Sequence, residues 1–399
     1  MPRSPIHSVR PLTLCYDGIT TATLRAEECI MSADPHVVTR EQVLEALRSV
    51  EDPELHKSIV DLDMVRDIQV GDGRVSVNAL LTISACPLRE TIVNSIRERV
   101  RTIPGVREVD VTLGEMAPNE RQALIAKLRG GEVSTTRRSS FITPESPVRV
   151  LTIASGKGGV GKSTVTVNLA VALRQLGHRV GIIDADVYGF SIPRMLGVRG
   201  RPTMIDQMVV PLEKDGIRVM SIGFMLPDET DAVVWRGPML HKALTTFINE
   251  VHWGDDMDYL LLDLPPGTGD VSITIAQTLP QTRMVIVTTP QAAAVSVAQR
   301  AARMAEKVNI EVLGIIENMS YYQAAPDQPP VYIFGRGGGQ RLAEAQSVPL
   351  LGEIPLDPAV REGGDNGVPV ILSAPESPAA KAFRATAERL VRRLPIPVA

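Results

Sequence analysis

The sequence predicts a two-domain α/β fold: a doubly wound, mostly parallel sheet preceded by a small domain of order α-β-β-α-β. Its 399 residues exceed what one ordinary core accommodates. A continuous apolar strand at 148–154 leads through a glycine-rich turn into a helical pattern at 164–176, as in parallel α/β sheets. Nearer the N-terminus, strand patterns at 64–70 and 74–83 flank Gly71-Asp72-Gly73, which predicts a hairpin.

Composition and charge narrow the classes of function. Hydrophobic residues make up 44% and charged residues 22%, which are ordinary values for a globular chain. The net charge of −4 supplies no basic field for nucleic acid, and no apolar run is long enough to cross a bilayer, so neither partner is expected. Cys15, Cys29 and Cys86 form no CxxC pair, which excludes a disulfide scaffold and favours a cytoplasmic location.

Four segments are predicted along the chain. The first lacks periodicity and is expected to be either disordered or a start assigned too early, with Met31 as the alternative first residue. The second is the small domain, which begins with a capping-box pattern at Thr39. The third is a linker rich in Gly, Ser, Thr and Arg, and the fourth is the larger domain. Their boundaries are 1–38, 39–116, 117–146 and 147–395.

The glycine-rich turn has the pattern of a phosphate-binding loop. Residues 156–163 satisfy G-x-x-x-x-G-K-[ST] with a strand before and a helix after. Glycines let backbone N–H groups surround the phosphates, and the helix N-terminus adds positive potential. Lys162 is assigned to the β- and γ-phosphates of ATP and the Ser163 hydroxyl to Mg²⁺. The predicted contacts in this stretch are Gly156, Lys157, Gly158, Gly159, Val160, Gly161, Lys162, Ser163 and Thr164.

Two carboxylates follow strands whose carboxyl ends are expected to lie near this loop. Asp186 comes after the strand at 180–183, and Asp263 comes after the strand at 259–262. An isolated Asp at a strand end is often only a cap. Two of them beside one phosphate-binding loop favour a nucleotide site.

The second lysine of the loop, Lys157, resembles the deviant loop of the MinD, ParA and nitrogenase iron-protein ATPases. That resemblance implies that Lys157 reaches the phosphates of a partner subunit in a homodimer, with phosphate attraction within one subunit as the alternative. It also implies that Asp186 orients the attacking water or the metal, and that Asp263 holds Mg²⁺ through water. Gly267 would donate to the γ-phosphate. Asn318 would contact the purine ring, unless it serves only turn chemistry.

Further strings narrow the resemblance to one branch. They are Asp184-Ala185-Asp186-Val187-Tyr188-Gly189, Trp235-Arg236-Gly237-Pro238-Met239, Glu317-Asn318-Met319-Ser320-Tyr321 and Ile333-Phe334-Gly335-Arg336-Gly337-Gly338-Gly339. They resemble the Mrp/ApbC family of iron–sulfur cluster carrier ATPases. That family places Cys-x-x-Cys six and nine residues after the Asn of Asn-Met-Ser, but positions 318 + 6 and 318 + 9 here are Ala324 and Asp327.

The small domain carries a resemblance of its own. The stretches are Asp52-Pro53-Glu54-Leu55, Ser58-Ile59-Val60-Asp61-Leu62 and Leu81-Thr82-Ile83-Ser84-Ala85-Cys86-Pro87-Leu88. They are similar to the small domain of iron–sulfur assembly factors, which implies a lone thiol, Cys86, between a strand and a helix. A helix N-terminus favours the thiolate, the form that binds metal, so Cys86 is a possible cluster ligand. The alternative is a small buried apolar residue.

Taken together, the patterns predict an ATPase that binds ATP and Mg²⁺ and acts in iron–sulfur cluster assembly, with assembly proteins and apoprotein recipients as partners. The residues expected to carry hydrolysis are Lys157, Lys162, Asp186 and Asp263. One alternative is a MinD/ParA-like positioning ATPase. Another is a nucleotide-dependent scaffold that no longer binds a cluster, since the ligand cysteines of the family are replaced.

Overall fold

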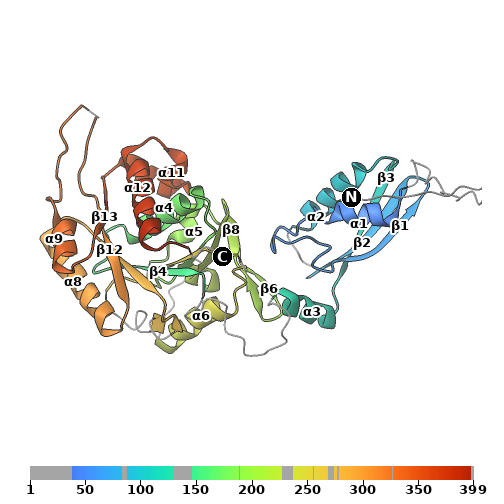
Figure 1. Cartoon of the computed structure of the whole chain (residues 1–399), viewed down its shortest axis with the longest axis horizontal. Coiled ribbons are helices and arrows are strands. Elements are labelled where there is room, and N and C mark those ends of the chain that lie inside the picture. Colours follow the sequence, from blue (N-terminus) through green and yellow to red (C-terminus); the bar gives the residue numbers. More distant parts are fainter. Residues whose placement is uncertain are drawn as a thin grey trace, which may run out of the picture.

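The computed structural model places two lobes side by side, a small N-terminal lobe and a larger one (Figure 1). It describes residues 38–82, 88–128, 146–187, 189–226, 237–254, 256–267, 274–275, 278–325 and 327–396. The predicted N-terminal extension therefore lies outside the described residues, apart from position 38. Most of the predicted linker and Cys86 also lie outside them.

The small lobe has the predicted order α-β-β-α-β. Its elements are α1 (Arg40–Leu47), β1 (Val65–Gly71), β2 (Arg74–Leu81), α2 (Arg89–Arg101) and β3 (Glu108–Glu115). The capping box at Thr39 is present, because Thr39 and Gln42 each accept a hydrogen bond from the other's backbone N–H. Strands β1 and β2 are antiparallel and β3 lies parallel to β2. Asp72 and Gly73, both at positive φ, make the tight turn of the β1–β2 hairpin.

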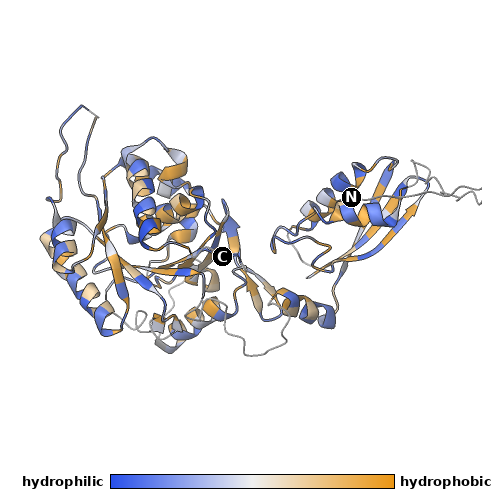
Figure 2. Cartoon of the chain, in the orientation of Figure 1, coloured by the Kyte–Doolittle hydropathy of each residue, from blue (hydrophilic) through white to orange (hydrophobic). Residues whose placement is uncertain are grey.

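The alternation of buried and exposed residues explains how the three-stranded sheet packs against its helices. Along β2, residues 75, 77, 79 and 81 are buried, as the period of two predicts. Helix α2 turns Ile92, Ile96 and Val100 toward the sheet, at a spacing of four residues. Hydrophobic and hydrophilic residues accordingly alternate along the elements in Figure 2.

The larger lobe is built on an eight-stranded sheet of order β13-β12-β11-β4-β10-β5-β9-β8. The strands are β4 (Arg149–Ser155), β5 (Val180–Asp184), β8 (Leu212–Lys214), β9 (Ile217–Ser221), β10 (Tyr259–Asp263), β11 (Arg283–Thr288), β12 (Glu311–Asn318) and β13 (Leu350–Ile354). All neighbours are parallel except β8, which is antiparallel to β9. Every residue of β5 and β10 is buried, as expected for strands covered on both faces. The predicted doubly wound, mostly parallel fold is confirmed.

Helices cover both faces of the sheet, so two apolar clusters form (Figure 1). One cluster includes residues of α6 (Gly237–Asn249), α8 (Ala292–Lys307) and α9 (Gly338–Ala345). The other includes residues of α4 (Lys162–Gln175), α5 (Ile192–Leu196), α11 (Val370–Ser373) and α12 (Pro378–Arg393). Helix α10 (Pro358–Asn366) contacts α5 and α11. Among the described residues, none of the helices combines the length and apolar character needed to cross a membrane.

A segment that the sequence patterns did not predict joins the lobes. Residues 191–221, called the insertion below, contain α5, β6 (Thr203–Ile205), β7 (Met208–Val210), β8 and β9. The β6–β7 hairpin belongs to the apolar cluster of the small lobe, through Ile205, Met208 and Val210. Helix α3 (Pro118–Leu128), at the start of the predicted linker, adds buried Leu124 and Leu128 to that cluster.

Candidate nucleotide site

The glycine-rich loop connects β4 to α4 at the carboxyl edge of the sheet. Helix α4 begins at Lys162, two residues before the predicted start, because Gly161 serves as its N-cap at a left-handed φ of 80°. A side chain at this φ would be strained, which explains the glycine. Gly156 lies so close to the backbone of Val297 and Ala298 in α8 that a Cβ there would overlap it. The backbone conformation of Gly161 and the close approach of Gly156 to α8 therefore fix the loop between α4 and α8.

A buried network forms directly behind the loop. Lys162 Nζ lies 2.7 Å from Asp263 Oδ2, and Ser163 Oγ donates to the same carboxylate oxygen at 2.6 Å. The second oxygen, Oδ1, accepts from Thr166 Oγ1 at 2.7 Å. Asp263 is fully buried, so one cation and two hydroxyls compensate its charge. The structure thus brings three of the predicted site residues together and adds Thr166.

Asp186 and its neighbour Asp184 lie at the edge of this network. Asp186 Oδ2 is 3.4 Å from Lys162 Nζ, so it faces the same cation as Asp263. Asp184 accepts backbone N–H bonds from Ser191 and Ile192 and a hydroxyl bond from Ser221. Burial, together with the nearby Asp263 charge, raises the pKa of Asp184 to about 7. The sequence patterns did not single out Asp184 as a site residue.

The two loop lysines point to different partners. Lys157 Nζ donates to Gln291 Oε1 at 3.2 Å and is not part of the Lys162–Asp263 network. Gln291 is the residue that precedes α8. The ammonium of Lys157 is thus held by a partner different from that of Lys162.

Gly267 and Asn318 border the loop from two other segments. The Gly267 N–H donates to the Ser155 carbonyl at 2.9 Å, and its φ of 104° suits only glycine. Asn318 Nδ2 donates to the Val160 carbonyl at 2.9 Å. Asn318 and Thr164 also line a cavity of about 400 Å³. Its wall is completed by residues that sequence reasoning missed, from α5, the stretch after β13, and α10: Arg194, Met195, Pro355, Leu356, Asp357, Val360 and Arg361.

The two positions at which the resembled family carries cysteines are not part of this network. Ala324 and Asp327 are exposed in the loop between β12 and α9, which is closed by two backbone hydrogen bonds between Tyr322 and Val331. Within the described ranges, no group of three or more His, Cys, Asp or Glu side chains is placed to hold a metal ion. Cys86 is outside those ranges.

Strand, glycine-rich loop, helix and a buried Walker-type aspartate define the class: an α/β P-loop nucleotide-binding protein. Residues 147–391 match the family described as ParA, the NUBPL iron-transfer P-loop NTPase. The chain belongs to that family. Residues 40–112 match the iron–sulfur cluster assembly protein family, which bears out the resemblance of the small domain.

Curated relatives cover most of the chain. A protein of Mycobacterium tuberculosis H37Rv named iron–sulfur cluster carrier protein is 46% identical over 87% of this chain and 92% of its own. A protein of the same name from Synechocystis is 42% identical over 90% of this chain and 98% of its own. A solved nucleotide-binding protein from Archaeoglobus fulgidus, in complex with ADP, is 39% identical over 55% of this chain and 86% of its own, with a TM-score of 0.49.

Proposed function

We propose that the protein binds Mg·ATP in this site, hydrolyses it, and delivers iron–sulfur clusters to apoproteins. The observation that carries the nucleotide part is the convergence of Lys162, Ser163 and Asp263 behind a glycine loop. A buried ammonium beside such a loop supplies the point charge that β- and γ-phosphates require. The carrier part is supported by family membership and by the names of the relatives.

Two hard oxygen ligands fit magnesium. Ser163 Oγ and Asp263 Oδ2 are 2.6 Å apart, and Mg²⁺ favours hydroxyl, carboxylate and water oxygens. Ser163 would hold the ion directly and Asp263 through water, while Mg²⁺ would neutralise charge on the phosphates. In the structure Lys162 pairs with Asp263. We propose that Lys162 turns to the phosphates when nucleotide binds, and that Asp186 then orients the attacking water or the metal.

The other proposed contacts follow the geometry of the loop. Backbone N–H groups of residues 156–164 would surround the phosphates, and Gly267 would donate to the γ-phosphate. The cavity beside Asn318 is large enough for a purine ring, which its amide would recognise. Lys157 would act on the nucleotide of a second subunit, so hydrolysis would need a homodimer.

The iron–sulfur cluster is cargo in this proposal. Because position 324 is Ala and position 327 is Asp, the loop of this chain offers no thiolates, and a carboxylate is a poor match for iron–sulfur chemistry. Cys86 is the remaining candidate ligand in the regions with family matches. We propose that it holds cargo transiently, together with exogenous thiols or a partner protein. A cytoplasmic location stays a prediction.

The replaced cysteines favour one second candidate, a nucleotide-dependent scaffold that binds assembly partners without carrying a cluster. Transfer assays separate the two functions. Protein reconstituted with iron and sulfide is mixed with an apo-ferredoxin that has a chromophoric cluster, with and without Mg·ATP. Cluster appearing on the acceptor faster than from free iron and sulfide supports the carrier. ATP hydrolysis without any acceleration of transfer would favour the scaffold.

A further inference from the structure

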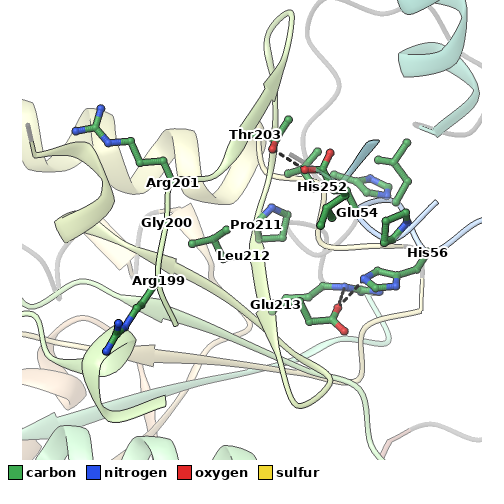
Figure 3. Close-up of a pocket in the computed structure, with 15 residues that line it drawn as sticks. Glu54, His56, Arg199, Gly200, Arg201, Thr203, Pro211, Leu212, Glu213 and His252 are labelled. Atoms are coloured by element: carbon green, nitrogen blue, oxygen red, sulfur yellow. Dashed lines mark hydrogen bonds and ion pairs between the residues drawn. The ribbon is translucent and has the colours of Figure 1, made fainter. Parts of the chain in front are cut away.

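Three polar contacts, which we call the domain joint, link the small lobe to the insertion beside the apolar cluster that they share. His56 Nε2 lies 2.9 Å from Glu213 Oε2 of β8. The Thr203 hydroxyl of β6 donates to Glu54 at 2.8 Å, and Arg121 of α3 lies 3.2 Å from Asp206 in the β6–β7 turn. Figure 3 shows the first two contacts at the rim of one cavity, with Glu54 and His56 facing the insertion.

A tight turn built by Asp52 presents His56 to this joint. The buried Asp52 side chain accepts from the backbone N–H groups of Glu54 and Leu55, and its carbonyl accepts from His56 N–H. His56 itself adopts a left-handed φ of 50°, an uncommon conformation for a residue other than glycine. Such a strained position persists only where its surroundings hold it, and it aims the imidazole at Glu213.

The cavity enclosed by the joint has a volume of about 440 Å³ and is lined by both lobes. Pro53 and Leu88 come from the small lobe, while Pro211 and Leu212 come from the insertion. The lobes meet both around this cavity and along a packed apolar face, because the β6–β7 hairpin lies in the apolar cluster of the small lobe. Polar contacts at the rim of the cavity add pairing specificity to this apolar packing.

The insertion links this joint to the phosphate site through one carboxylate. At its start, the Ser191 and Ile192 N–H groups bond to Asp184 Oδ2, and at its end the Ser221 hydroxyl bonds to the same oxygen. The other oxygen, Oδ1, accepts the N–H of Asp186, which faces Lys162. Both ends of the segment that docks the small lobe are thus anchored beside the phosphate-binding lysine.

We propose that the domain joint is a pH-sensitive latch, and that through the insertion it couples the position of the small lobe to occupancy of the phosphate site. The coupling rests on the nucleotide binding proposed above, whereas the latch does not. The element with two states is the small lobe, which is either docked or released. Asp184 is the residue through which the domain joint and the phosphate site both influence that state.

The ion pair between His56 and Glu213 favours the docked small lobe at lower pH. The hydrogen bond with Glu213 is the main cause that raises the pKa of His56 above 6.5, although burial opposes it, and the same contact lowers the pKa of Glu213. The charged pair stabilises docking fully below 6.5 and weakens as pH rises through the raised pKa of His56. The groups that act on the charge of His56 are Glu213, Arg218 and Glu51. The other titratable or charged groups that line the cavity with it are Glu54, Arg199, Arg201 and His252.

Hydrogen exchange in the full-length protein tests the latch without nucleotide. Exchange of residues 203–210 and 118–128, corrected for the intrinsic pH effect, is measured from about pH 6 to about pH 8.5. Wild type should lose protection by about twofold to fivefold over this range, since both partners of the pair are partly exposed. His56→Gln and Glu213→Gln should show the high-pH behaviour throughout. Glu376→Gln, which removes the exposed Lys381–Glu376 pair, should follow wild type.

A pH dependence that persists in both joint variants would overturn the latch. The coupling is tested by adding Mg·ATP, while calorimetry measures binding on the same samples. Exchange at 203–210 should change in wild type and stay unchanged in Lys162→Ala. If calorimetry shows binding but exchange at 203–210 does not respond, the coupling is wrong and the nucleotide site stands. If calorimetry shows no binding in wild type, the proposed function itself fails.

Discussion

The nucleotide site and the loop between β12 and α9 differ in how completely they are built. Behind the phosphate-binding loop, Lys162, Ser163 and Thr166 all meet one buried carboxylate, Asp263. In the β12–α9 loop, Ala324 and Asp327 are exposed and supply no thiolate. The comparison teaches that the buried network and the exposed loop share no residue, so each can be changed without altering the other. Predictions that disturb one region should leave the other unchanged.

The largest expected effect is from Lys162→Ala. Loss of the ammonium that we propose to contact the phosphates should lower hydrolysis by about 100-fold or more and weaken ATP binding strongly. It also leaves buried Asp263 without its cation, which should cost about 3 kcal/mol of unfolding free energy in the absence of nucleotide. Hydrolysis assays and urea unfolding measure both effects. Lys381→Ala, at an exposed lysine of α12, is the matched control, and near-normal hydrolysis by Lys162→Ala would refute the site.

A smaller loss is expected from Lys157→Ala. If this lysine acts across an interface, the variant should bind ATP but hydrolyse it about 10- to 100-fold more slowly. Mixing it with Lys162→Ala protein should restore part of the activity in mixed dimers. Hydrolysis is measured against protein concentration, together with mass by light scattering. Full activity in a strict monomer would contradict the role across an interface.

Introducing cysteines into the β12–α9 loop tests the same comparison at the second of the two regions. The double variant Ala324→Cys with Asp327→Cys places two soft ligands on an exposed loop, so the proposed homodimer should hold, after reconstitution, a cluster that resists chelators. The visible absorbance of the cluster, followed after a chelator is added, measures retention. Both side chains are exposed, so ATP hydrolysis should remain within about twofold of wild type. A loss of hydrolysis here would show that the two regions are not separable.

The smallest expected effect is from Cys86→Ala on ATP hydrolysis. The phosphate network involves elements of the larger lobe only, so turnover should stay within about twofold. Steady-state hydrolysis measures this, with the Michaelis constant for ATP as a second readout. A drop as large as that of Lys157→Ala would mean that the small lobe takes part in hydrolysis.

Sequence patterns predicted the elements in which local and tertiary preferences agree. The continuous apolar runs of β4, β5 and β10 indicated buried parallel strands, and Gly-Lys-Ser after β4 located the phosphate loop. Thr166 was missed, although its place one helical turn after Lys162 puts it on the same face of α4 and could have revealed it.

Other features could not be derived from local sequence. Strands β6, β7 and β8 have three residues each, too few for a period of two to be recognised. His56 and Glu213 are far apart in the chain and meet only because the lobes dock. The purine-sized cavity needs α10, whose polar face resembles any solvated helix.

We propose that this chain keeps the nucleotide site of its family while it holds cargo only weakly. Iron and sulfide analysis of anaerobically reconstituted protein tests it most directly, on chains that begin at Met31 so that Cys15 and Cys29 are absent. The wild-type sequence is compared with Cys86→Ala before and after a chelator. We predict little cluster in wild type, rapid loss to the chelator, and none in Cys86→Ala, while both proteins hydrolyse ATP equally. A chelator-resistant cluster in Cys86→Ala would contradict the account, because it would require ligands other than those identified.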